Sequence, residues 1–242
     1  MNKTAVIIPA RYNSKRLQGK PLIKVCDKPI IQWVWERAVT VKSADIVIIA
    51  TDNKEIYDTA KEFGANVEMT RDDHKSGSDR IVEVAEKYPD FAYIINLQGD
   101  EPMINTDCVE EVIKQIKEDE NADISTLLTE IENEDLDDPN MVKCVKDING
   151  YAMYFSRSKI PYERNIGIAK FYKHIGIYGY KRDALFKMSK FSQPEIERAE
   201  SLEQLRALYN GMKIKTSVVK YNSIGIDTIE DLNKFKKFAE CN

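Results

Sequence analysis

The sequence lacks any apolar run long enough to cross a membrane. Its apolar stretches are short, whereas a helix that spans a bilayer needs roughly 20 consecutive apolar residues. The N-terminal residues Met1-Asn2-Lys3-Thr4 lead directly into a strand-like segment, so we expect no signal peptide. These features predict a protein that does not insert into membranes.

Cysteine and histidine are also scarce. The chain has four cysteines and two histidines, and no two cysteines form a CxxC pair. The cysteines are Cys26, Cys108, Cys144 and Cys241. We interpret them as reduced thiols and expect a cytoplasmic protein. His74 and His174 lie too far apart in the sequence to suggest a zinc site built on histidine.

Two further features argue against particular classes of function. The formal net charge is −4, which argues against nucleic acid as the main partner because nucleic-acid-binding proteins usually present a broad basic face. No GxGxxG motif follows the first strand-like segment, so the sequence does not support a dinucleotide-binding Rossmann domain.

Apolar segments alternate with amphipathic segments through the first half of the chain. Such a pattern predicts an α/β fold, in which a mostly parallel sheet has helices on both faces. We expect Asn53 to cap the second helix and Gly64 to end it. The expected strands are 5–10, 45–52, 65–70 and 92–97, and the expected helices are 29–41, 54–63, 78–88 and 108–117.

The pattern changes after about residue 124. A β-hairpin with its turn at Asn149-Gly150 is predicted there, together with further strands and helices. The strands are 124–131, 142–147, 151–156, 172–180 and 213–220, and the helices are 183–191, 194–210 and 228–241. Because no repeat or linker divides the chain, we expect one domain over residues 1–242 with a small β-rich subdomain at about 130–190.

A basic loop follows the first predicted strand. Residues 8–22 read IPARYNSKRLQGKPL and contain four cations, Arg11, Lys15, Arg16 and Lys20. Ligands of open α/β sheets bind outside the carboxyl ends of the strands, and guanidinium and ammonium groups bind phosphate oxygens. The loop therefore predicts a triphosphate site, although its charge alone would equally fit a solvated basic turn.

Two aspartates stand where predicted strands end. Asp100 follows the fourth predicted strand, and Asp227 lies between the last predicted strand and the last helix. Magnesium prefers one or two carboxylates together with substrate phosphates, so both are candidate Mg²⁺ ligands. The alternatives are that Asp100 is a turn residue before Pro102 and that Asp227 caps the last helix.

Two other segments are candidate substrate loops. Residues 73–80 offer hydroxyl groups, a glycine and Arg80 near a helix N-terminus, which suits an anion or a polar base. The alternative is an ordinary turn with Ser78 as the helix cap. Residues 173–180 alternate polar and apolar side chains, and they fit either a ligand-binding strand or a half-exposed one.

Seven motifs between residues 8 and 232 carry a family resemblance. They are IPARYNSKRLQGKPL, HKSGSDR, NLQGDEP, YAMYFSRSKIP, KHIGIYGY, SLEQLRALYNG and GIDTIEDL. Together they resemble the 3-deoxy-manno-octulosonate (Kdo) cytidylyltransferases over nearly the whole chain. The first motif also resembles other sugar nucleotidyltransferases, whereas the later motifs are more specific. The resemblance implies a nucleotide-diphospho-sugar transferase-like fold, dependence on Mg²⁺, and a homodimer formed through the subdomain at 130–190 that also binds the sugar.

The resemblance also implies roles for individual residues. Those expected to bind the nucleotide are Ala10, Arg11, Ser14, Arg16, Lys20, Ser76, Gly77, Arg80 and Gln98. Those expected to face the sugar acid are Arg157, His174, Tyr178, Glu203 and Gln204. Asp100 and Asp227 would bind magnesium and act in catalysis together with Arg16 and Lys20.

The resulting hypothesis is transfer of CMP from CTP to the anomeric 2-hydroxyl of Kdo, with release of diphosphate, for lipopolysaccharide or capsule synthesis. The sugar hydroxyl is the nucleophile, so catalysis would rest on positioning and on charge neutralisation at the α-phosphate. The alternatives are a cytidylyltransferase for 8-amino-Kdo or another ulosonic acid, and a CTP-binding module without catalysis. A glycosyltransferase is disfavoured because Asp100-Glu101-Pro102 is not a DxD motif.

Overall fold

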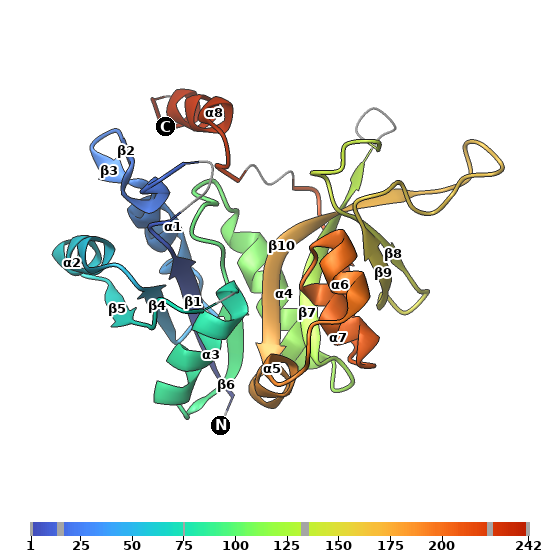
Figure 1. Cartoon of the computed structure of the whole chain (residues 1–242), viewed down its shortest axis with the longest axis horizontal. Coiled ribbons are helices and arrows are strands. Elements are labelled where there is room, and N and C mark those ends of the chain that lie inside the picture. The colour runs from blue at the N-terminus through green and yellow to red at the C-terminus, as the bar shows by residue number, and fades with distance from the viewer. Residues whose placement is uncertain (1, 14–16, 75, 132–135, 222–224, 241–242) are drawn as a thin grey trace. The chain divides into compact units, whose positions relative to one another are not determined.

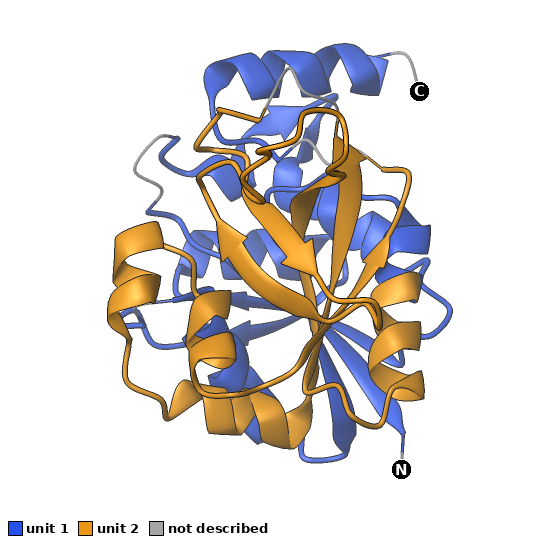
Figure 2. Ribbon diagram, turned by 90° about the vertical axis from the view of Figure 1, so that its right-hand side faces the viewer, with its two compact units in different colours: residues 1–110, 223–242 blue, residues 111–222 orange. Residues whose placement is uncertain are grey.

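A computed structural model describes residues 2–13, 17–74, 76–131, 136–221 and 225–240 (Figure 1). The chain divides into two compact units, coloured separately in Figure 2. Unit 1 contains residues 1–110 and 223–242, and unit 2 contains residues 111–222. The end of the chain therefore belongs to the same unit as its beginning.

Unit 1 is built on a parallel sheet. Its strands run in the order β6 (Phe91–Asn96), β1 (Lys3–Ala10), β4 (Ile46–Thr51) and β5 (Asn66–Met69), and each neighbouring pair is parallel. The consecutive residues 4–8 of β1 are all buried, as expected for a strand that is covered on both faces. This arrangement confirms the predicted α/β class.

The helices of unit 1 begin and end close to the predicted positions. Asn53 caps α2 because its Oδ1 accepts a hydrogen bond from the backbone N–H of Ile56 at 3.0 Å. Gly64 follows the helix with φ +86°, a conformation that favours glycine. The helices are α1 (Ile30–Ala38), α2 (Lys54–Glu62), α3 (Gly77–Lys87) and α8 (Ile229–Glu240), with the start of α4 (Thr106–Glu118) and the short 3₁₀ helix η1 (Lys20–Leu22).

The C-terminal helix completes the core of unit 1. Leu232 and Phe235 of α8 pack with Ile30 and with Val25, which lies in a small hairpin of β2 (Lys24–Val25) and β3 (Lys28–Pro29). Trp33 meets Phe235 edge to face, with ring centroids 5.5 Å apart. The apolar face of α8 is therefore buried against segments from the first part of the chain.

Unit 2 is built around β7 (Ile124–Ile131). This strand pairs antiparallel with β10 (Phe171–Lys181) and parallel with β11 (Ile214–Val218). The predicted hairpin is confirmed as β8 (Lys143–Lys146) and β9 (Ala152–Ser156), and β8 also pairs with β10. Among the described residues, every helix is too short or too polar to span a bilayer.

The helices of unit 2 differ from the prediction at one point. The segment 194–210, predicted as one helix, is divided into α6 (Glu195–Glu200) and α7 (Gln204–Tyr209), after α5 (Arg182–Ser189). Ser201 ends α6 with φ +52° in the left-handed region. Arg157 binds the main chain at this break, because its Nε donates to the Glu200 carbonyl at 2.7 Å.

Candidate active site

A cavity of about 280 Å³ lies at the carboxyl ends of β1 and β6 in unit 1. It is lined by six residues that the sequence predicted for the site: Ala10, Arg11, Lys20, Gly77, Gln98 and Asp100. It is also lined by Gly99, the glycine beside Asp100, and by three residues to which the sequence analysis assigned no role: Pro9, Asn13 and Pro21. Its position matches the rule that ligands of α/β sheets bind at the carboxyl ends of the strands.

Gly99 allows the loop after β6 to lie against the end of β1. A Cβ atom at this position would be 2.7 Å from the backbone oxygen of Pro9, closer than real Cβ atoms approach. Only glycine fits this contact without a backbone shift. The close approach brings Asp100 to the cavity wall.

Lys20 joins the two predicted magnesium ligands. Its ammonium donates hydrogen bonds to Asp100 Oδ2 at 2.6 Å, to the Ile226 carbonyl at 2.8 Å and to Asp227 Oδ1 at 3.2 Å. The residue is only 9% exposed, and all three of its N–H groups are engaged. The two aspartates thus converge on one cation, although they are far apart in the sequence.

Asp227 is not the cap of α8. The backbone N–H of Asp231 donates to the hydroxyl of Thr228 at 3.2 Å, and that hydroxyl donates to Asp231 Oδ2 at 2.9 Å. Thr228 therefore supplies the cap. The Asp227 carboxylate faces Lys20 instead, which removes the structural alternative considered for this residue.

Arg11 supplies a second cation at the cavity. Its Nη2 atom is buried and has no hydrogen-bond partner among the described residues. A buried donor of this kind is costly to leave unsatisfied, so the position favours a ligand with acceptor oxygens. Two other predicted phosphate ligands, Ser14 and Arg16, lie outside the described residues.

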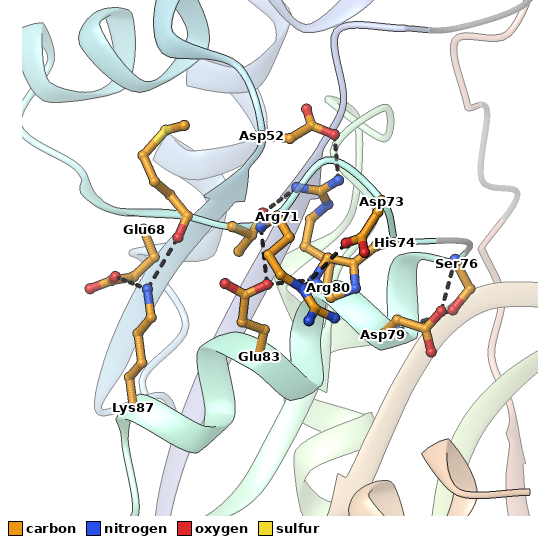
Figure 3. A network of polar contacts seen from close by, with 12 residues as sticks. Asp52, Glu68, Arg71, Asp73, His74, Ser76, Asp79, Arg80, Glu83 and Lys87 are labelled. Carbon is orange, nitrogen blue, oxygen red and sulfur yellow. Dashed lines mark hydrogen bonds and ion pairs between the residues drawn. The ribbon is translucent and has the colours of Figure 1, made fainter.

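Arg80, a residue of α3, is absent from the lining of the cavity, and its side chain is buried (Figure 3). Its guanidinium is 0% exposed and contacts Asp52 Oδ2 at 2.5 Å and the hydroxyl of Thr70. Burial lowers the pKa of Arg80, and the Asp52 carboxylate opposes that shift. Sequence reasoning missed Asp52, although it is the last residue of a predicted strand and directly follows β4 at the ligand edge of the sheet.

The segment before α3 is fixed by polar contacts with that helix (Figure 3). Ser76 caps the helix in a capping box with Asp79, so the cap is Ser76 and not Ser78. His74 Nε2 lies 2.5 Å from Glu83 Oε2. Burial alone would raise the pKa of Glu83, but the hydrogen bond with His74 lowers it below its ordinary value. These contacts hold the first turn of α3, where Gly77 lines the cavity.

The predicted sugar-binding residues lie in unit 2, where a bulge in β10 brings two of them together. Ile175 pairs with Leu127 but Tyr178 pairs with Thr126, so two residues of β10 have no partner position in β7. In consequence, the ring centroids of His174 and Tyr178 are 5.3 Å apart, whereas four residues of a regular strand span about 13 Å.

The electrostatics of this pair follow from burial. Burial lowers the pKa of His174 to about 3, so the imidazole is neutral. Burial also raises the pKa of Tyr178 well above its ordinary value, and the nearby Tyr180 and Glu203 add to the shift. The phenol therefore remains a hydrogen-bond donor at neutral pH. Gln204, the first residue of α7, is buried.

Arg157 is held mainly by backbone oxygens. Its Nε, Nη1 and Nη2 atoms donate to the carbonyls of Glu200, Pro139 and Ser201 at 2.7, 2.9 and 3.4 Å. The fully buried ammonium of Lys143 adds a further bond, to the Arg157 carbonyl at 2.5 Å. Nε, Nη1 and Nη2 of the guanidinium are thus already engaged with backbone carbonyls. Pairing of Arg157 with a sugar carboxylate stays a prediction.

Comparison with known proteins places the chain in a family. Residues 5–214 match the family described as Cytidylyltransferase. The chain is 45% identical over 237 residues to a 3-deoxy-manno-octulosonate cytidylyltransferase of Fusobacterium nucleatum, covering 98% of this chain and 96% of that protein. It is 44% identical over 236 residues to the protein of that name from Escherichia coli, with 98% and 96% covered.

A solved structure agrees with these relatives. The structure of a CMP:2-keto-3-deoxy-manno-octonic acid synthetase complexed with CTP superposes with a TM-score of 0.96 at 42% identity, over 99% of each chain. The fold is that of a nucleotidyltransferase. The chain belongs to the cytidylyltransferase family and, within it, to the 3-deoxy-manno-octulosonate cytidylyltransferases.

Proposed function

We propose that this protein transfers CMP from CTP to the anomeric 2-hydroxyl of Kdo and releases diphosphate. The observation that carries the proposal is the convergence of Arg11, Lys20 and Asp100 on one cavity at the strand ends. The nucleotide substrate is supported by the similarity to a synthetase solved with CTP. The sugar is supported by the names of relatives that match the chain over almost its full length.

In the proposed reaction, the sugar oxygen attacks the α-phosphorus of CTP and the bond from that phosphorus to the bridging oxygen breaks. Diphosphate leaves with the bond electrons, and the sugar hydroxyl loses its proton. Arg11 has a buried donor without a partner among the described residues, and it would bind phosphate oxygens. Lys20 would add positive charge near the phosphates. Ser14 and Arg16 are proposed phosphate ligands on the resemblance alone.

Asp100 and Asp227 would hold the magnesium ion. The fit is supported by the contact of both carboxylates with a single ammonium, which places their oxygens within reach of one cation. Among the described residues, no group of three or more His, Cys, Asp or Glu side chains could bind a metal. Two carboxylates completed by substrate phosphates are the donor set that magnesium prefers. When bound, the ion would polarise the α-phosphate and lower the pKa of the attacking hydroxyl.

We also propose that the protein is a cytoplasmic homodimer. Unit 2 presents large apolar side chains to solvent in the region predicted for dimerisation, and Ile148, Tyr162 and Ile166 are 98%, 89% and 92% exposed. Exposed apolar groups of this kind often mark protein interfaces. Sedimentation of the purified protein would give the mass of a dimer if the proposal is right and that of one chain if it is wrong.

The reaction is tested by measuring diphosphate release from CTP and Kdo with Mg²⁺, beside reactions with UTP, 8-amino-Kdo and sialic acid. We expect turnover with CTP and Kdo only. Turnover with another acid sugar would change the substrate, and CTP binding without turnover would favour a sensing module. Asp100→Asn should lower kcat on the order of 10²-fold, whereas Asp107→Asn, an exposed aspartate in α4, should leave kcat unchanged.

A further inference from the structure

The bulge in β10 lies opposite a buried threonine. Thr126 of β7 is 0% exposed and pairs with Tyr178, directly after the two residues that have no partner position. Its hydroxyl oxygen lies 3.0 Å from His174 Nε2, 3.2 Å from the Ile175 carbonyl and 2.7 Å from the Ile177 carbonyl. One hydroxyl therefore contacts both the bulged backbone and the imidazole.

Proton counting decides the direction of these bonds. A threonine hydroxyl has one proton to donate, and a carbonyl oxygen can only accept. The Thr126 hydroxyl oxygen lies 2.7 Å from the Ile177 carbonyl oxygen, a distance that requires a proton between them. Because the carbonyl has no proton, the hydroxyl donates to Ile177. The hydroxyl must then accept from His174, which requires a proton on Nε2.

The other ring nitrogen is left as an acceptor. Burial keeps the His174 imidazole neutral, so a proton on Nε2 leaves Nδ1 unprotonated. Nδ1 has no hydrogen-bond partner in the part of the chain that the structure describes. The ring is held edge to face by Phe155, with centroids 5.0 Å apart, and it lies next to Tyr178.

We propose that Thr126 is a positioning residue for sugar recognition, which fixes His174 in the Nε2-protonated form so that Nδ1 accepts a hydrogen bond from a substrate hydroxyl. By donating to the bulge, the same threonine keeps Tyr178, a donor, beside that acceptor. The acceptor on His174 and the donor on Tyr178 can then bind neighbouring hydroxyl groups of a polyhydroxylated acid, since each hydroxyl both donates and accepts. The inference rests on the proposed function, since that function assigns His174 and Tyr178 to the sugar.

The test begins with the tautomer, which is read from ¹⁵N chemical shifts of the imidazoles at neutral pH. The chain has only two histidines, so the spectrum is easily assigned and His74 serves as an internal reference. We expect His174 to show a protonated Nε2 and an unprotonated Nδ1 in the wild type and in Thr126→Ser. In Thr126→Val, which removes the hydroxyl but keeps the shape, we expect a mixture of tautomers.

Kinetics supply the second readout. Thr126→Val should raise the KM for Kdo on the order of tenfold, the effect of one neutral hydrogen bond, and should leave the KM for CTP within about twofold. Thr126→Ser should restore the KM for Kdo. Thr129→Val is the matched control, because Thr129 is a buried threonine on the same strand that pairs with Lys173 and not with the bulge.

Two results would overturn the inference. One is a wild-type His174 protonated on Nδ1, a measurement that needs no variant to fold. The other is a folded Thr126→Val protein that keeps both the single tautomer and the wild-type KM for Kdo. A wild type that shows the expected tautomer but binds no Kdo would contradict the proposed function, while the Thr126–His174 contact would stand.

Discussion

Replacing Asp52 with asparagine should destabilise unit 1 strongly, because Arg80 would lose its largest compensating charge (Figure 3). The Arg80 side chain is 0% exposed and that of Asp52 is 17% exposed. Asparagine has nearly the same shape and keeps one acceptor oxygen. The substitution therefore removes the charge while preserving most of the packing.

The magnitude follows from the burial of the pair. Removing one partner of a buried ion pair costs about 3–5 kcal/mol, because the remaining charge is left uncompensated. Asp52 retains some contact with solvent, and the Glu83 carboxylate still offsets part of the Arg80 charge. We therefore expect a loss at the lower end of this range, about 3 kcal/mol, in the free energy of unfolding. The Lys54–Asp58 pair of α2 is the control. Its side chains are 82% and 51% exposed, and Asp58→Asn should cost less than about 0.5 kcal/mol.

Urea denaturation followed by tryptophan fluorescence measures both variants. The chain has two tryptophans, Trp33 and Trp35 of α1, and both lie in the unit that contains Arg80. Asp52→Asn should shift the midpoint to lower urea without changing the slope m. A shift no larger than that of Asp58→Asn would refute the reasoning, because it would show that the Asp52 charge does not stabilise Arg80.

Two further predictions concern stability. Gly99→Ala should lower the free energy of unfolding by about 1–3 kcal/mol, since its Cβ would lie 2.7 Å from the Pro9 oxygen. Gly77→Ala is the control, because a Cβ there meets nothing closer than 3.9 Å. Equal urea midpoints for the two variants would contradict this prediction. The second prediction is that the wild type loses stability relative to His174→Gln as the pH falls below about 6.5, by up to about 1.4 kcal/mol per pH unit. The unfolded chain takes up a proton that the folded His174, with its pKa of about 3, does not accept. Parallel stability curves between pH 6.5 and 4.5 would exclude this.

The sequence predicted those features that depend on local pattern. The apolar strands, the Asn53 cap and the hairpin turn at Gly150 are all present, because each is set by a few neighbouring residues. The break at Ser201 was missed. The apolar spacing continues through it, and serine gives no signal of a left-handed residue.

The site was predictable only in part, because local sequence patterns do not encode contacts between distant residues. Motifs placed Arg11, Lys20 and Asp100 near one another, and the structure brings them to one cavity. The contact of Lys20 with both aspartates joins residues up to 207 positions apart, and no local pattern encodes it. The same is true of the bulge opposite Thr126, because strand register depends on tertiary pairing.

The discontinuity of unit 1 has a consequence for biosynthesis. The apolar surface around Val25 and Ile30 is completed by Leu232 and Phe235, which leave the ribosome only after all of unit 2 has been made. At about 5–20 residues per second, the nascent first unit waits roughly ten seconds without its last helix. During that interval its exposed apolar patch is open to chaperones and to aggregation, and premature termination before Leu232 would leave the patch permanently uncovered.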